Sequence, residues 1–111
     1  MDLELDQVEQ YRLQYFFDPG SGVCLWSDND LARGKFGYPV DLGDLPVTST
    51  VKTWAEELIA RFDTSIEWTN PSGPSPWSDM ERERFEVEAA GLLRSLRECP
   101  GAEFEIRDCT R

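Results

Sequence analysis

Histidine is absent from this sequence of 111 residues. Histidine is the usual general base of Ser-His-Asp and Cys-His enzymes and the commonest zinc ligand, so its absence excludes those enzymes and histidine-containing zinc sites. Glycine-rich phosphate loops are missing too, because neither GxGxxG nor GxxxxGK[ST] occurs. We therefore expect a protein that is not an enzyme and that holds neither a metal nor a cofactor.

Cysteine is scarce: Cys24, Cys99 and Cys109 are an odd set without a CxxC spacing. This excludes a disulfide framework and is typical of reduced thiols in the cytoplasm. One bridge, between Cys99 and Cys109, remains an alternative because the two segments can pack together.

Long apolar runs are also missing, and none approaches the roughly 18 residues of a transmembrane helix. The first residues, Met-Asp-Leu-Glu-Leu-Asp, carry acids and no apolar stretch, unlike a signal peptide. We expect a soluble, cytoplasmic protein.

Basic residues are few, with 11 Lys and Arg against 22 Asp and Glu, which gives a net charge of −11. A nucleic-acid binder needs a basic surface, and anionic membranes repel an acidic one, so the charge argues against both partners. Opposite charge accelerates association with a basic protein. The composition therefore predicts a basic protein partner, with solubility alone as the other explanation of the acid excess.

The hydrophobic pattern predicts an α+β domain that covers residues 1–111, with an acidic N-terminal segment, 1–10, that frays. Strands are expected at 11–17, 23–26 and 102–107, and helices at 48–63 and from 78 to the Pro100-Gly101 pair. Residues 11–26 read as a hairpin, residues 31–33 as a short helical turn and residues 38–42 as extended chain. We expect a small antiparallel sheet of about three strands, in the order β-β-α-α-β, with both helices packed on one face.

Two cap signals define where the long helices begin. Thr48 or Ser49 is expected to cap the first helix. Ser78 and Glu81 form a capping box at the start of the second.

The 64–77 segment is a long loop with three Pro residues and the aromatic side chains of Trp68 and Trp77. It either folds back over the core or presents the two indoles as anchors for a partner, because Trp supplies a large contact area at low entropy cost. A second acidic loop around residues 41–44 is either solvated surface or part of the same interface. The candidate partner-binding residues are Asp41, Asp44, Glu67, Trp68, Trp77 and Asp79.

Several short motifs resemble those of a group of small acidic bacterial proteins, and the resemblance covers residues 23–106. The motifs are Cys24-Leu25-Trp26-Ser27, Phe36-Gly37-Tyr38-Pro39-Val40 with Leu42 and Leu45-Pro46, Asp63-Thr64-Ser65, and Pro74-Ser75-Pro76-Trp77-Ser78. In size and charge the group is similar to the immunity proteins of bacterial polymorphic toxin systems. The resemblance implies a protein that binds a toxin domain and blocks its active site or an essential surface.

Three other classes remain open. An acidic nucleic-acid mimic would display rows of acids, whereas the acids of residues 79–88 are interleaved with Arg82 and Arg84. A different non-catalytic interaction module fits the same composition. An enzyme that uses carboxylates alone would need two acids in an apolar pocket, and no sequence feature places them there.

Overall fold

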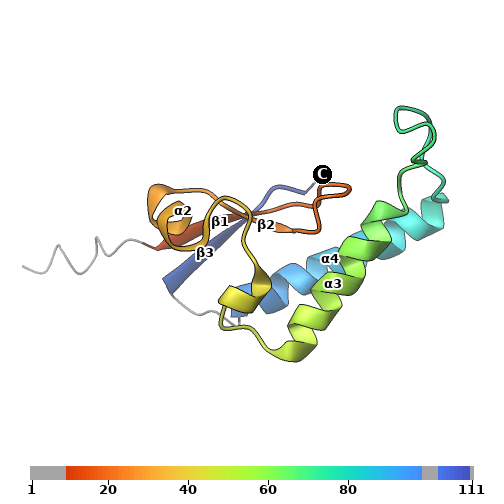
Figure 1. Ribbon diagram of the computed structural model, residues 1–111. Coiled ribbons are helices and arrows are strands. Elements are labelled where there is room, and N and C mark those ends of the chain that lie inside the picture. The colour runs from red at the N-terminus through yellow and green to blue at the C-terminus, as the bar shows by residue number, and fades with distance from the viewer. Residues whose placement is uncertain (1–9, 99–102, 111) are drawn as a thin grey trace, which may run out of the picture.

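The chain has an α+β fold in which a three-stranded sheet lies beside a pair of long helices (Figure 1). The computed structural model describes residues 10–98 and 103–110. The elements are β1 (Tyr11–Tyr15), β2 (Leu25–Ser27), α2 (Asp30–Phe36), the 3-10 helix η1 (Leu42–Asp44), α3 (Ser49–Asp63), α4 (Asp79–Glu98) and β3 (Phe104–Asp108). The predicted class and the order of strands and long helices are confirmed. Of the segment predicted to fray, residues 1–9 lie outside the described residues.

The sheet is mixed, so the prediction of an antiparallel sheet is wrong for one of its two strand pairs. The central strand β1 pairs antiparallel with β2, with Tyr15 opposite Leu25, and parallel with β3, with Tyr11 opposite Phe104. A hairpin loop joins β1 to β2 and reverses the chain direction. β3 instead follows α4, whose length carries the chain back past the sheet, as a parallel crossover requires.

Residues that follow β2 and α2 extend the sheet by a short piece of chain. Trp26 and Pro39 form an isolated antiparallel bridge, the Ser27 N–H donates to the Tyr38 carbonyl at 2.7 Å, and the Val40 N–H donates to the Leu25 carbonyl at 2.9 Å. The prediction of extended chain over 38–42 is therefore right for the first four residues, since the backbone of Asp41 is extended as well. It fails at Leu42, where η1 begins.

One face of the sheet carries the core. Leu13, Tyr15, Leu25 and Ile106 are buried on this face and share one apolar cluster with the buried stripe of α4. α3 packs against α4, and the two helices run side by side in opposite chain directions (Figure 1). The Arg61 guanidinium of α3 also contacts the Glu88 carboxylate of α4 at 2.9 Å.

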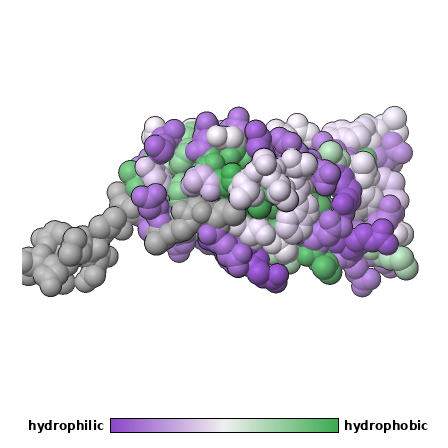
Figure 2. All heavy atoms as spheres, turned by 90° about the horizontal axis from the view of Figure 1, so that it is seen from below, coloured by the Kyte–Doolittle hydropathy of each residue, from purple (hydrophilic) through white to green (hydrophobic). Residues whose placement is uncertain are grey.

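The opposite face of the sheet is mostly polar. Exposed ion pairs join Arg12 to Glu105 at 3.3 Å and Arg107 to Asp28 at 3.2 Å. Seen from below, the surface of the whole molecule is a mixture of hydrophilic and intermediate side chains with smaller hydrophobic areas (Figure 2). This division between the faces follows from the alternation of apolar and polar residues along β1 and β3.

The N-terminal ends of the long helices are capped as predicted, whereas the predicted stop at Pro100-Gly101 lies outside the described residues. Thr48 accepts the Val51 N–H at 3.1 Å. Ser78 accepts the Glu81 N–H at 3.1 Å, and the Glu81 carboxylate accepts the Ser78 N–H at 2.8 Å. At the C-terminal end of α4, the Arg97 guanidinium donates two hydrogen bonds to the Ile106 carbonyl of β3, at 3.1 and 2.9 Å.

A buried hydrogen bond joins the sheet to α4. The side chain of Tyr15 is 1% exposed, and its hydroxyl donates to the Ala89 carbonyl at 2.7 Å. Tyr15 lies at the end of the central strand, and Ala89 lies on the buried stripe of α4. The bond therefore fixes both the position of α4 along the sheet and the distance between α4 and the sheet.

Replacing Tyr15 by Phe removes this hydrogen bond and keeps the ring. We expect the free energy of unfolding in urea to fall by about 1 kcal/mol, the usual net contribution of a buried hydrogen bond. Tyr38→Phe is the matched control, because Tyr38 is 50% exposed, and we expect a change below about 0.5 kcal/mol. Equal losses in the two variants would contradict a structural role for the Tyr15 hydroxyl.

Candidate functional site

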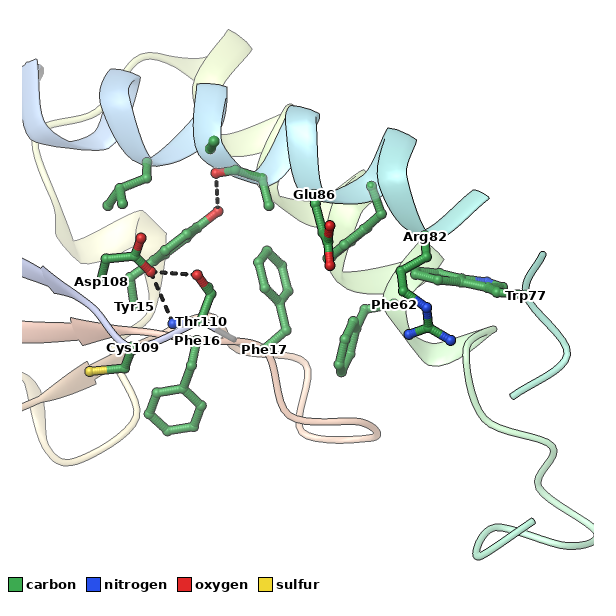
Figure 3. Close-up of a pocket in the computed structure, with 14 residues that line it drawn as sticks. Tyr15, Phe16, Phe17, Phe62, Trp77, Arg82, Glu86, Asp108, Cys109 and Thr110 are labelled. Carbon is green, nitrogen blue, oxygen red and sulfur yellow. Dashed lines mark hydrogen bonds between the residues drawn. The ribbon is translucent and has the colours of Figure 1, made fainter. Parts of the chain in front are cut away.

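A groove with a volume of about 780 Å³ opens between α4 and the end of the sheet (Figure 3). One wall is α4, which contributes Phe85, Glu86 and Ala90. The opposite wall consists of residues at and just after the ends of β1 and β3, including Phe17 and Asp108. The Tyr15–Ala89 hydrogen bond lies at the inner end of the groove and holds these two walls at a fixed separation.

Six aromatic residues line the groove, and four of them, from four separate segments, form one cluster. Phe85 of α4 lies among the other three, with its ring centroid 5.0 Å from Phe17, 5.4 Å from Phe62 and 5.2 Å from Trp77. Phe85 is buried, whereas the other three are only partly buried. Such clusters are rigid, because ring pairs at 5–7 Å attract one another beyond simple burial. The result is a preformed apolar hollow that is open to solvent.

Charged groups lie at the mouth of this hollow. Arg82 and Glu86 are one turn apart on α4, whereas Asp108 lies on the strand wall beside Tyr15 and Thr110, away from Arg82 (Figure 3). The Asp108 carboxylate accepts the Thr110 N–H at 2.9 Å, and the Cys109 N–H donates to the Tyr15 carbonyl at 2.9 Å. The strand wall is therefore held in place by backbone hydrogen bonds, while the carboxylates of Glu86 and Asp108 remain accessible to a ligand.

The titratable groups of the core are held neutral by burial. Burial, followed by the nearby charges of Cys24 and Asp108, raises the pKa of the Tyr15 phenol above its ordinary value, so the phenol acts as a donor at neutral pH. Burial raises the pKa of Cys24 to about 12. Neither group has the depressed pKa of a nucleophile.

A metal site is not supported either. Within residues 10–98 and 103–110, no three His, Cys, Asp or Glu side chains are grouped so that they could hold a metal ion. Cys24 and Cys109 carry free thiols. Cys99, the other half of the bridge considered from the sequence, lies outside the described residues.

The two loop tryptophans both turn back onto the end of α3. The Trp77 indole N–H donates to the Thr64 hydroxyl at 2.7 Å, and the Trp68 indole N–H donates to the Asp63 carbonyl at 3.0 Å. Asp63 also accepts the Gly20 N–H at 2.9 Å, so the tip of the hairpin is tied to the same point. Trp77 lines the groove, whereas Trp68 lies outside its lining and is 54% exposed.

The six predicted partner-binding residues fall into two groups. Asp41 and Asp44 are exposed around η1, before α3, where the Asp41 carboxylate caps the Gly43 N–H at 2.8 Å. Glu67 and Asp79 are exposed beyond the other end of α3, near the two tryptophans. The 15 residues of α3 separate the groups by about 22 Å. Of the six residues only Trp77 lines the groove. The two groups do not form one compact patch.

Sequence reasoning missed the groove because its walls are far apart in the sequence. Phe17, Phe62 and Phe85 each read as ordinary members of an apolar stripe, and Asp108 carries no motif. The only signal was the aromatic-rich loop, whose Trp77 lines the groove.

Comparison with known proteins gives no family for this chain: neither a family model nor a curated protein matches it. In the described part of the chain, no helix combines the length and the apolar character needed to cross a membrane.

The packing predicts that replacing the two loop tryptophans by Ala lowers the free energy of unfolding by different amounts. Trp77→Ala removes contacts with Phe62 and Phe85, so we expect it to lower the free energy of unfolding by about 2–3 kcal/mol, less than a fully buried ring would cost. Trp68→Ala removes a half-exposed ring, and we expect a loss below about 1 kcal/mol. Urea denaturation of the two variants measures this difference, and a larger loss for Trp68 would overturn the packing described here.

The raised pKa of Cys24 predicts a loss of stability at alkaline pH. In the unfolded chain the thiol ionises near its ordinary value of 9.0, so its contribution to stability is complete below that pH and declines as the pH rises towards 12. Between about pH 9 and 10 the free energy of unfolding of the wild-type protein should fall by about 1 kcal/mol more than that of Cys24→Ala. Urea denaturation at each pH measures the slopes, and equal slopes would show that the thiol is not shielded. The raised pKa of Tyr15 also lowers stability at alkaline pH, but mainly at pH values above the ordinary tyrosine pKa of 10.0.

Proposed function

We propose that this protein is an immunity-type protein that binds a basic bacterial toxin domain and neutralises it. The observation that carries the proposal is the groove: a preformed aromatic hollow with carboxylates at its mouth, on a protein with a net charge of −11. Central aromatic anchor sites surrounded by polar groups are the usual high-energy parts of protein interfaces.

The chemistry of the groove favours binding over catalysis. A carboxylate enzyme needs one acid held protonated in an apolar setting beside a second, ionised one. Here the groove carboxylates of Glu86 and Asp108 lie at its open mouth, and its buried phenol, Tyr15, is occupied by the Ala89 carbonyl. Such a site can hold a side chain of a partner but offers no activated group to attack it.

The arrangement of charges favours a basic protein over the alternative of nucleic-acid mimicry. A mimic needs uninterrupted rows of acids, whereas on α4 the acids alternate with Arg82 and Arg84. Glu88 is paired with Arg61, whose hydrogen bonds hold the pKa of Glu88 below its ordinary value. We also propose a cytoplasmic location, where the thiols of Cys24 and Cys109 stay reduced.

Co-expression tests the proposal. In a bacterial host, the protein is produced together with the toxin domain encoded next to its own gene, and growth is compared with expression of that domain alone. We expect restored growth and a complex that survives purification. The association rate should fall at least tenfold between about 50 and about 500 mM NaCl, because the attraction between opposite charges is screened. No protection, or a rate indifferent to salt, would contradict the proposal.

Two charge-matched double variants show which end of α3 takes part in binding the toxin domain. Glu67→Gln with Asp79→Asn removes two acids at the end of α3 that is nearer to Trp77, and Asp41→Asn with Asp44→Asn removes two at the η1 end. We expect the first pair to slow association more, because charges at the rim of an interface act mainly on the association rate. A larger effect of the second pair would move the interface to the η1 end.

A further inference from the structure

We propose that the groove between α4 and the end of the sheet is the docking site for a basic peptide segment with an aromatic residue at its centre. The aromatic side chain enters the hollow beside Phe17, Trp77 and Phe85, and flanking Lys or Arg side chains contact Glu86 and Asp108. The proposed function enters this inference at one point only: it identifies the protein that carries the segment as a toxin domain.

The apolar part of the site is preformed, and none of the residues that the structure describes fills it. Phe17, Trp77 and Phe85 all line the groove, and Phe85 contacts the other two at ring distances of 5.0 and 5.2 Å. A volume of about 780 Å³ lies within the usual range for ligand pockets and exceeds what a single small apolar group needs. A flat ring can stack on these walls without rearranging them, and an adjacent cation can lie over an exposed ring face.

The charged part of the site favours a ligand of positive charge. Glu86 approaches from the helix wall and Asp108 from the strand wall (Figure 3). Neither carboxylate takes part in an ion pair among the described residues. Asp79 and Glu83 lie on the same side of α4 as Glu86, by their three- and four-residue spacing. Among the described residues Arg82 is the single base of the lining, against the two acids Glu86 and Asp108, so this lining is negative overall.

The same charges disfavour the other occupants. A second copy of this chain would bring a net charge of −11 to a negative groove. Residues 1–9 of the chain itself carry four acids and no Lys or Arg, so they would be repelled as well. A basic segment of a partner is the occupant that complements both the hollow and its rim.

Three capped tripeptides test the proposal by NMR titration of the ¹⁵N-labelled protein. Lys-Trp-Lys should shift the Trp77 indole signal and the amides of Ala90, Cys109 and Thr110, with a dissociation constant on the order of 1 mM. Glu-Trp-Glu has the ring with the wrong charge, and Lys-Ala-Lys has the charge without the ring. Each should bind at least tenfold more weakly.

Two matched pairs of variants locate the binding on the groove. Ala90→Phe places a ring in the groove from an exposed position of α4, and Val87→Phe places the same ring on the other side of that helix, where Val87 is 73% exposed. Glu86→Gln removes a carboxylate of the rim, and Glu56→Gln removes one from α3. We expect Ala90→Phe and Glu86→Gln to weaken Lys-Trp-Lys binding at least fivefold, and Val87→Phe and Glu56→Gln to leave it unchanged. All four variants should unfold cooperatively, which shows that they are folded.

Equal binding of the three peptides, shifts centred away from the groove, or full binding to Ala90→Phe would overturn the inference. The growth-protection assay separates this failure from failure of the proposed function. Protection without Lys-Trp-Lys binding would leave the immunity function in place and reject the groove as a docking site. Binding without protection would support the site and reject the toxin as its partner.

Discussion

The hydrogen bond from the Tyr15 hydroxyl to the Ala89 carbonyl is the contact on which the rest of the arrangement depends. It ties the end of the central strand to the middle of α4, and the groove opens directly beside it. A helix lying closer to the sheet would fill the hollow with its own side chains, and one farther away would separate Phe17 from Phe85. The width of the groove is therefore set by a bond in the core.

Local signals in the sequence predicted the elements of the fold well. The Ser78–Glu81 capping box, the Thr48 cap and the hairpin of residues 11–26 all form as expected. Each depends on residues close in sequence, where backbone geometry and side-chain chemistry act directly. The direction of β3 depends instead on how far α4 carries the chain, and local pattern does not encode that.

The candidate site was only partly predictable for the same reason. Trp77 stood out because two indoles in a Pro-rich loop are unusual, but the rings it meets, Phe62 and Phe85, looked like ordinary core residues. Whether an aromatic residue of a stripe is covered or faces a hollow depends on contacts across the whole chain. The charge, by contrast, is a property of composition, and the excess of acids by itself favours a basic partner.

The contact between Arg97 and β3 limits how this protein can associate with others. β3 is an outer strand of the sheet, and a bare strand edge invites main-chain pairing with another molecule, the first step towards stacked aggregates. The Arg97 guanidinium occupies the Ile106 carbonyl in the middle of that edge with two hydrogen bonds. A neighbouring strand would have to displace it. Lateral growth of the sheet is thereby obstructed, and recognition is left to side chains, which can discriminate one partner from another.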